Sequence, residues 1–154
     1  MRAFLIFLFT LSLWVPVHAT DSGPGGKVVK VLPLWLDQQG RTATSPSLFD
    51  RDAYQFFLLN HTNDISAVRY DVLWSAAKNK ADKLTVRVEL RGVGEAGAPR
   101  LKNLEAEVTP GRFRQWTSLT LGGVDFKQFG AVVAWRATLW NGSELLGEQK
   151  SFLW

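Results

Sequence analysis

Cysteine is absent from this sequence of 154 residues. Its absence excludes disulfide bonds, thiolate metal ligands, cysteine nucleophiles and a lipid-modified cysteine. Histidine is nearly as scarce, because His61 alone lies beyond the first 19 residues. A Ser-His-Asp triad needs a histidine that carries the proton, and a zinc site needs several converging ligands. The sequence also lacks a G-x-S-x-G elbow, so both chemistries are disfavoured.

The sequence also has no large excess of either positive or negative charge. The chain carries 18 Lys and Arg against 14 Asp and Glu, a formal net charge of +4. This excess is too weak to indicate a nucleic-acid partner. Two carboxylate pairs, Asp50/Asp52 and Glu105/Glu107, have i, i+2 spacing. Any such pair on a strand is ~7 Å apart, the separation of an inverting glycosidase, so the spacing is typical of surface charge. We expect no enzyme activity, no metal site and no cofactor.

Long apolar runs are missing except near the N-terminus. Arg2 supplies a positive n-region, Ala3–Val15 forms an apolar stretch, and Val17-His18-Ala19 fits a cleavage site. The apolar stretch is about 13 residues, too short at ~1.5 Å per residue for the ~30 Å core of a bilayer. We therefore expect residues 1–19 to be a signal peptide cleaved after Ala19. The protein is then periplasmic or secreted, of bacterial origin since it has no disulfides, and has no membrane span.

Three segments of the chain differ in composition. Residues 20–26 are rich in Gly, Pro and Ser and predict a flexible mature N-terminus, whereas residues 27–154 have the length of a single domain. The first apolar segment, Val28–Leu36, predicts a strand. Because Pro33 cannot donate a hydrogen bond to a neighbouring strand, this is an edge strand or a strand with a break.

One helix is predicted after a polar connection. Ser45-Pro46 or Asp50 is a suitable cap, and His61 follows the helix. Apolar residues at three- and four-residue spacing predict the face that covers a sheet edge. That face comprises Phe49, Ala53, Phe56, Phe57 and Asn60.

The remaining sequence alternates apolar and polar residues with a period of two, which is typical of half-buried antiparallel strands. The expected strands are 65–75, 84–91, 101–108, 113–121, 131–140 and 143–154. In the fourth of them Phe113, Leu119 and Leu121 share one face. A loop over 122–130 contains a helical turn at 125–129, Asn141-Gly142 predicts a type I′ hairpin turn, and Gly147 predicts a bulge.

This pattern predicts an all-β fold, an antiparallel immunoglobulin-like β-sandwich of about seven strands with one short helix between the first two. The last hairpin, around Asn141-Gly142, resembles the final strands of immunoglobulin and fibronectin type III domains, and Trp74 resembles their core tryptophan. Trp135 is in phase with apolar neighbours and is expected in the core with Trp74. The chain also resembles small uncharacterised exported bacterial proteins that end in a tryptophan-rich hairpin. These resemblances imply a fold rather than an activity.

Gly92, Gly94 and Gly97 match the G-x-G-x-x-G pattern of dinucleotide-binding sites. That pattern requires a helix to begin at the third glycine. Ala98-Pro99 follows instead, which favours a glycine-rich loop.

Basic and aromatic residues provide the remaining candidate for a binding site. Arg112, Arg114 and Trp116 fall on one face of their expected strand, and Trp140 is out of phase with Trp135 and exposed beside the turn. Guanidinium groups and an indole bind anionic or glycan polymers by hydrogen bonds and stacking. We expect a non-catalytic exported protein that binds a protein or a cell-envelope polymer. The alternative is a carbohydrate-binding module that uses these four residues.

Overall fold

The computed structural model describes residues 25–77, 83–94 and 97–154. The expected signal peptide, residues 20–24, and residues 78–82 of the polar segment between the expected strands 65–75 and 84–91 lie outside the described residues. The described part forms seven strands, two α-helices and one 3-10 turn. In chain order they are β1 (Gly26–Asp37), α1 (Leu48–Asn60), η1 (Thr62–Asp64), β2 (Ile65–Ala76), β3 (Leu84–Val93), β4 (Pro99–Val108), β5 (Gln115–Gly122), α2 (Gly123–Phe129), β6 (Ala131–Asn141) and β7 (Glu144–Lys150).

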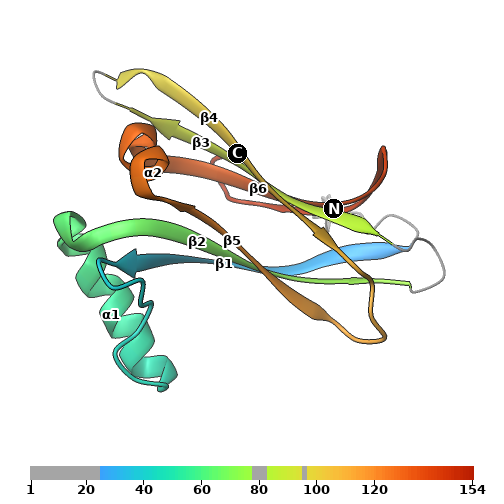
Figure 1. Cartoon of the computed structure of the whole chain (residues 1–154), viewed down its shortest axis with the longest axis horizontal. Coiled ribbons are helices and arrows are strands. Elements are labelled where there is room, and N and C mark those ends of the chain that lie inside the picture. Colours follow the sequence, from blue (N-terminus) through green and yellow to red (C-terminus); the bar gives the residue numbers. More distant parts are fainter. Residues whose placement is uncertain (1–24, 78–82, 95–96) are drawn as a thin grey trace, which may run out of the picture.

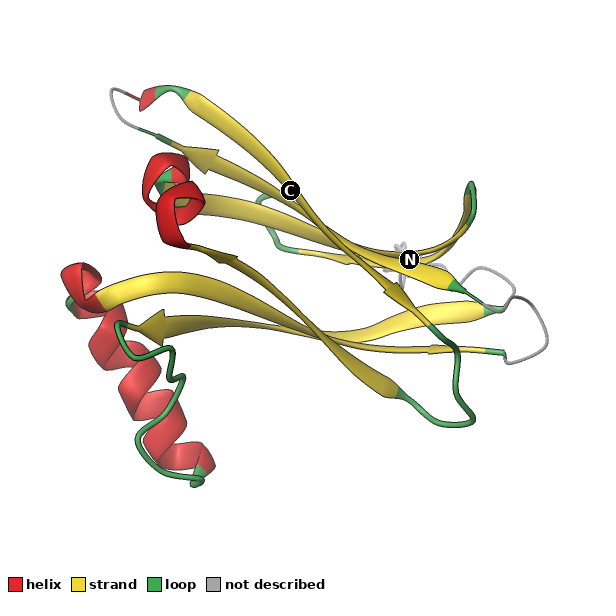
Figure 2. Ribbon diagram, in the orientation of Figure 1, coloured by secondary structure: helices red, strands yellow, loops and turns green. Residues whose placement is uncertain are grey.

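The strands build two antiparallel sheets that face each other (Figures 1 and 2). One sheet has the order β1-β2-β5 and the other has the order β4-β3-β6-β7. The expectation of a mainly β chain with about seven antiparallel strands is confirmed. Helix α1 leaves the end of the three-stranded sheet at a steep angle, and α2 lies near the same end of the molecule.

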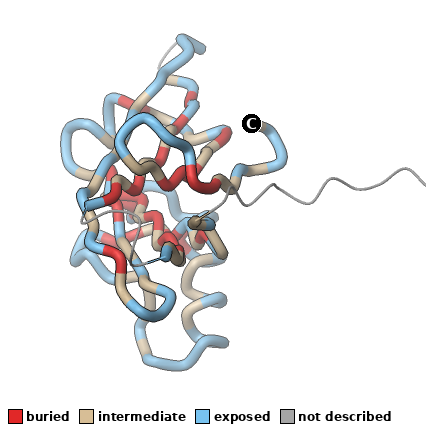
Figure 3. The backbone as a smooth tube through the Cα atoms, turned by 90° about the vertical axis from the view of Figure 1, so that its right-hand side faces the viewer, coloured by how far each residue is buried: buried red, intermediate tan, exposed pale blue. Residues whose placement is uncertain are grey.

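The core lies between the two inner faces, where Figure 3 shows the buried residues. Alternate residues of β2 and β3 supply most of it, because successive side chains of a strand point to opposite faces. Trp74 is 1% exposed and Leu90 is 1% exposed, so the expected core position of Trp74 is confirmed. Trp135 is half-buried and packs against the core, with its ring centroid 6.3 Å from that of Tyr70.

Strand β1 is an edge strand, as Pro33 predicts. It pairs with β2 alone, in a register that opposes Pro33 to Tyr70 and has irregularities near both of its ends. An edge strand leaves backbone donors and acceptors without strand partners. In this molecule α1 covers part of that edge.

The predicted inner face of α1 is wrong. Ala53, Phe56, Phe57 and Asn60 are exposed, and Phe49 is 81% exposed. The helix contacts the sheet instead through the opposite side, which carries Tyr54, Gln55 and the fully buried Leu58. The polar groups of this side bind the backbone of the edge strand, a role that apolar side chains cannot fill.

Two strands begin or bend differently from the sequence-based expectation. Strand β5 begins at Gln115, so Phe113 precedes it and is 76% exposed instead of sharing the inner face with Leu119. In β6 the register slips beside Arg91, which makes Val133 an extra residue. This bulge turns Val133 outward, and its side chain is 47% exposed.

The last hairpin also differs in detail. Asn141 pairs with Glu144, so the two-residue loop is Gly142-Ser143 and lies one residue later than predicted. Gly142 has a φ of 57° and takes the first central position, which requires positive φ in both favoured hairpin turns. The predicted irregularity at Gly147 is present, because Leu139 pairs with Gly147 while Trp140 pairs with Leu145. Strand β7 ends at Lys150, and a turn follows it over 151–154.

Candidate functional site

Helix α1 begins at a local set of hydrogen bonds. The Ser47 hydroxyl accepts from the Asp50 backbone N–H at 3.4 Å, which makes Ser47 the N-cap rather than Ser45 or Asp50. Ser45 instead donates its hydroxyl to the Asp50 carboxylate at 2.5 Å. A negative carboxylate in the first turn is favourable because the helix N-terminus carries partial positive charge. These hydrogen bonds fix the position at which the N-terminus of α1 begins.

Gln55 ties the middle of α1 to the edge of β1. Its Oε1 accepts from the Trp35 backbone N–H at 2.7 Å, and its Nε2 donates to the Trp35 carbonyl at 2.9 Å. The same Nε2 lies 2.8 Å from the Thr42 carbonyl. One amide side chain therefore supplies the donor and the acceptor that a neighbouring strand would otherwise provide.

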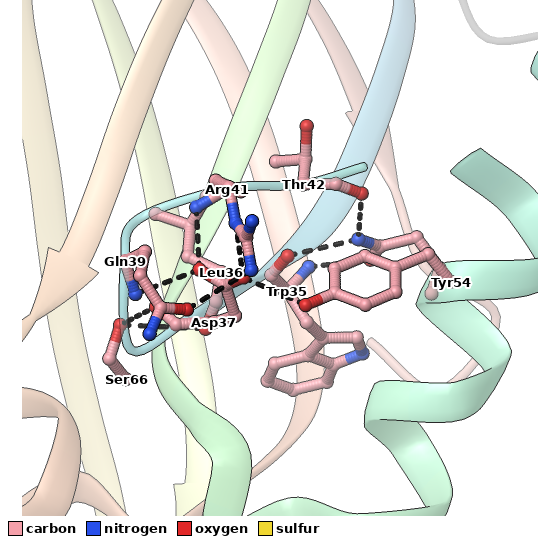
Figure 4. A network of polar contacts seen from close by, with 9 residues as sticks. Trp35, Leu36, Asp37, Gln39, Arg41, Thr42, Tyr54 and Ser66 are labelled. Atoms are coloured by element: carbon pink, nitrogen blue, oxygen red, sulfur yellow. Dashed lines mark hydrogen bonds and ion pairs between the residues drawn. The ribbon is translucent and has the colours of Figure 1, made fainter. Parts of the chain in front are cut away.

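Asp37, at the end of β1, is the second anchor (Figure 4). Its carboxylate accepts from the backbone N–H groups of Gln39 at 2.9 Å and Arg41 at 2.8 Å. The Arg41 guanidinium donates to the same carboxylate at 2.8 Å, and the Tyr54 hydroxyl of α1 donates to it at 2.7 Å. Asp37 is 3% exposed. A buried carboxylate with this many donors joins the strand, the following loop and the helix.

The pKa of Asp37 reflects two opposing effects. Burial raises the pKa because it disfavours the charged form. The hydrogen bonds from Arg41, Tyr54 and Gln39 outweigh burial, and together they lower the pKa from 3.8 to about 2. Asp37 is therefore a stable anion at neutral pH. The hydrogen bond to Asp37, with burial, raises the pKa of the Tyr54 hydroxyl, so the donor in this pair keeps its proton.

The opposite side of α1 carries five large apolar side chains in contact with solvent, which we call the outer face of α1. Their exposed fractions are Leu48 68%, Phe49 81%, Phe56 70%, Phe57 42% and Leu59 52%. Apart from the buried Leu58, the helix is exposed or half-buried along its length (Figure 3). Large apolar side chains gathered on one exposed helix face are a typical feature of interaction sites, so this face is a candidate site.

An open cavity of about 410 Å³ lies beside this face, at the end of the molecule that carries both α1 and α2. We call it the helical-end pocket. Its wall is mostly apolar and comes from β1, α1, α2, β2 and β6, with Trp35, Leu59, Ile65, Phe126 and Val132 as its main apolar residues. Lys127 and Thr62 add polar atoms at the same cavity. An apolar cavity with few polar groups is the usual form of a binding pocket.

The four residues predicted to form a binding site do not lie together. Arg112 and Arg114 are exposed in the connection before β5, and Trp116 is 52% exposed on β5 of the three-stranded sheet. Trp140 is half-buried on β6 of the four-stranded sheet. The structure therefore brings Arg112, Arg114 and Trp116 to one region and places Trp140 on the other layer.

Trp140 belongs to a different group of arginine–tryptophan pairs. The Arg87 guanidinium lies 5.4 Å from the Trp140 ring centroid, and the Trp140 Nε1 donates to the Thr138 hydroxyl at 2.8 Å. Arg91, four residues along β3, stacks on Trp154 at 4.0 Å. Both pairs lie on the outer face of the four-stranded sheet, since Arg87 and Arg91 alternate with buried residues of β3.

The carboxylates considered for catalysis are held by separate partners. Arg87 binds Glu105 at 2.7 Å and Lys83 binds Glu107 at 3.0 Å, while Arg51 binds Asp52 at 2.8 Å. His61 stacks on Phe57 with 4.1 Å between ring centroids. Two residues of the 92–97 glycine pattern, 95 and 96, lie outside the described residues.

Within the described ranges no three His, Asp or Glu side chains converge as metal ligands. No helix in that part of the chain is long and apolar enough to cross a membrane.

Comparisons with known proteins place few constraints on function. No family model matches the chain, and no curated protein matches it. A solved structure of a protein from Akkermansia muciniphila is similar over 86% of this chain and 74% of that chain, with a TM-score of 0.46 and 12% sequence identity. The functional argument therefore depends on the chain's own residues.

Sequence reasoning missed the outer face of α1 as a surface. The signal was present, because Phe49, Phe56 and Leu59 follow seven- and three-residue spacing, but that spacing predicts burial in the core equally well. It also missed the Arg91–Trp154 pair, whose members are 63 positions apart and meet only because the turn after β7 returns to the sheet.

Proposed function

We propose that this protein is an exported, non-catalytic binding module of the cell envelope that docks on a protein partner through the outer face of α1. The observation that carries the proposal is the exposure of five large apolar side chains on one 13-residue helix. The signal-peptide features of residues 1–19 support export. We also propose an immunoglobulin- or fibronectin type III-like fold. Its strand order differs from that of an immunoglobulin constant domain in the pairing of β4 with β3.

The way α1 is attached supports docking. A helix held to the sheet by Gln55, Tyr54 and Leu58 presents its outer face in a fixed orientation. A preorganised surface loses little conformational entropy on binding, so more of the burial energy remains as affinity. Burial of one such phenylalanine contributes about 1.5–3 kcal/mol.

The spacing of the exposed residues indicates the shape of the partner. Phe49 and Phe56 are seven residues apart, and Leu59 follows three residues later, so they form one stripe along the helix. Stripes of this kind fit into an apolar groove of another protein. The neighbouring helical-end pocket, which shares Leu59, is large enough to receive an apolar side chain from the rim of that groove.

Charge around the stripe indicates the chemistry of the groove. Asp50 and Asp52 lie near the start of α1, and its last turn has no basic residue. Asp52 is paired with Arg51, whereas Asp50 accepts a neutral hydroxyl donor. We therefore expect a groove whose edge carries Lys or Arg opposite the first turn of α1.

Photocrosslinking at position 56 in the native envelope tests the proposal. The adduct should contain one protein, and calorimetry with that purified protein should give a defined Kd. The substitution Phe56→Glu should raise this Kd at least ~30-fold, the effect of a side chain worth about 2 kcal/mol. Phe56 is 70% exposed, so the substitution should leave the thermal midpoint nearly unchanged.

Phe113 provides the matched control because it is 76% exposed and lies outside α1. The Phe113→Glu variant should bind the partner as the wild type does. The proposal is overturned if Phe56→Glu binds with unchanged affinity, or if the adduct at position 56 contains lipid or glycan instead of protein. Raising the salt concentration should weaken the wild-type complex.

Glycan binding by Arg112, Arg114 and Trp116 is the second candidate, and it is favoured by the 52% exposure of Trp116 beside two exposed arginines. An exposed indole stacks on sugar rings, and guanidinium groups bind acidic substituents. A fluorescence titration with a panel of polysaccharides should then respond in the wild type and not in Trp116→Ala. The variant Trp140→Phe should keep the response because Trp140 lies on the other sheet.

A further inference from the structure

A second open pocket, of about 450 Å³, lies on the four-stranded sheet where β3, β4 and the turn after β7 meet. We call it the Trp154 pocket. Its residues include Glu89 and Arg91 of β3, Leu101, Lys102 and Asn103 of β4, and Trp154. Glu89 pairs with Asn103, and Arg91 pairs with Leu101, across the two strands. Such cross-strand neighbours have Cβ atoms about 5 Å apart, so their side chains project side by side.

The turn after β7 holds Trp154 at this pocket. The Ser151 backbone N–H donates to the Trp135 carbonyl at 2.9 Å, and the Ser151 hydroxyl accepts from the Trp135 N–H at 3.0 Å. The Trp154 N–H then donates to the Ser151 carbonyl at 3.2 Å. Because Trp135 lies on β6, beside β3, these bonds bring the indole next to Arg91.

Arg91 is the cation of this pocket that has its donors available. Lys102 binds Asp125 at 2.6 Å, so its charge is already balanced. No carboxylate of the described residues lies within ion-pair distance of Arg91, whose guanidinium stacks on the Trp154 ring at 4.0 Å. Stacking uses the face of the guanidinium and leaves its N–H groups directed outward in the plane. Such an orientation suits a carboxylate, which accepts two parallel hydrogen bonds.

The other walls of the pocket suit hydroxyl groups. Glu89 lies 3.6 Å from Arg136, a distance that leaves acceptor capacity on its carboxylate. The Asn103 side chain is exposed and makes no hydrogen bond with the described residues. An amide offers both a donor and an acceptor, and a carboxylate accepts from two adjacent hydroxyls. Trp154 and Leu101 supply apolar surface for the C–H face of a ring.

We propose that the Trp154 pocket binds an acidic sugar, a pyranose ring that carries a carboxylate. The carboxylate pairs with Arg91, the apolar face of the ring packs on Trp154, and ring hydroxyls bind Glu89 and Asn103. This combination favours a sugar over an acidic peptide, because a peptide carboxylate needs the arginine alone and offers no hydroxyl pair. The site is separate from the outer face of α1 and from Trp116, so it does not depend on the function proposed above.

Nuclear magnetic resonance of the ¹⁵N-labelled protein tests this proposal with a local signal, the indole N–H resonance of Trp154. The probes are the methyl glycosides of glucuronate, galacturonate and N-acetylneuraminate, titrated into the millimolar range. At least one should shift the Trp154 resonance in a saturable manner. The methyl ester of the sugar that binds has the same ring without the negative charge of the carboxylate. This ester should bind at least ~10-fold more weakly than the free acid.

Two variants on one strand provide the matched comparison. Arg91→Gln removes the guanidinium and should raise the Kd at least ~10-fold, with a thermal midpoint close to that of the wild type. Arg87→Gln removes the arginine of the other arginine–tryptophan pair, about 13 Å along β3, and should leave the Kd unchanged. Saturable shifts that survive Arg91→Gln would overturn the proposal.

Three other outcomes would also overturn it. The first is that none of the three acidic sugars shifts the Trp154 resonance. The second is that the methyl ester binds as tightly as the free acid, which would make the site one for neutral sugars. The third is that an acetylated triglutamate peptide binds with equal affinity, which would make it a site for acidic peptides.

Discussion

At the scale of single residues, Asp37 joins the end of β1, the following loop and α1, the helix that carries the candidate surface. It receives hydrogen bonds from the loop through Gln39 and Arg41 and from α1 through Tyr54. The sequence shows only an aspartate at the end of an apolar segment, followed by a polar connection. Its role depends on the return of α1 to the strand, which local pattern does not show.

The first prediction concerns acid pH. The folded pKa of Asp37 is about 2, below its ordinary value of 3.8. The folded state therefore favours the anion, and this contribution to stability is present above pH ~4 and is lost as the pH falls through about 2. Asp37→Asn should lower the free energy of unfolding at pH 7 by about 2 kcal/mol, because it removes charge-assisted hydrogen bonds. Urea unfolding from pH 7 to pH 2 measures both effects.

Asp52 serves as the control for this prediction. It forms an ion pair with Arg51, and its side chain is 70% exposed, so Asp52→Asn should change the free energy of unfolding by less than about 0.5 kcal/mol. If Asp37→Asn and the wild type lose stability equally between pH 4 and pH 2, the assigned role of Asp37 is wrong.

At the scale of elements, α1 shows why a hydrophobic pattern identified the helix but not its inner face. The spacing from Phe49 to Asn60 predicts an amphipathic helix, and the helix is present. Hydropathy then selects the most apolar side as the buried one. The side of α1 that contacts the sheet is instead the one that carries Gln55. Its amide supplies the acceptor and the donor for the Trp35 backbone groups at the edge of β1. Unpaired backbone N–H and C=O groups at the edge of a sheet produce no periodic pattern of apolar residues in the sequence.

The second prediction tests which side of α1 holds it in place. Leu58 is fully buried, whereas its neighbour Leu59 is 52% exposed. Leu58→Ala should destabilise the attachment of α1 by about 3 kcal/mol. Native-state hydrogen exchange should show faster exchange of the α1 amides, with a smaller change in β2. Leu59→Ala should leave exchange almost unchanged, and equal effects of the two variants would refute the assigned orientation.

The strands were easier to predict than the site. Alternation located β2 and β3 because the residues on one face of each strand are buried, whereas those on the other face are half-buried or exposed. Alternation says nothing of which sheet a strand joins, so Trp116 and Trp140 were grouped although β5 and β6 lie in different sheets. The bulge at Val133 and the start of β5 after Phe113 were missed for a similar reason, since both depend on a neighbouring strand.

At the scale of the whole molecule, the two sheets approach each other closely along one side. There β7 of the four-stranded sheet passes β1 of the three-stranded sheet, and Gly147 lies against Lys27 and Val28. A Cβ atom at Gly147 would be 2.8 Å from the Lys27 Cα and 3.0 Å from the Val28 N. These are backbone atoms, which cannot move aside as the end of a side chain does.

The third prediction follows from this close approach. Gly147→Ala forces β1 and β7 apart, and we expect it to lower the free energy of unfolding by about 1–3 kcal/mol, the usual cost of an overpacked contact. Because β1 also carries the contacts that fix α1, the loss should reach the helix as well as both sheets. In urea the midpoint should fall while the slope stays constant, as expected of one cooperative unit.

Gly111→Ala, where a new Cβ meets only the movable side chain of Gln115 at 3.1 Å, should shift the midpoint far less. Separate transitions for α1 and the sheets in Gly147→Ala would show instead that the helix is not coupled to the junction between the sheets.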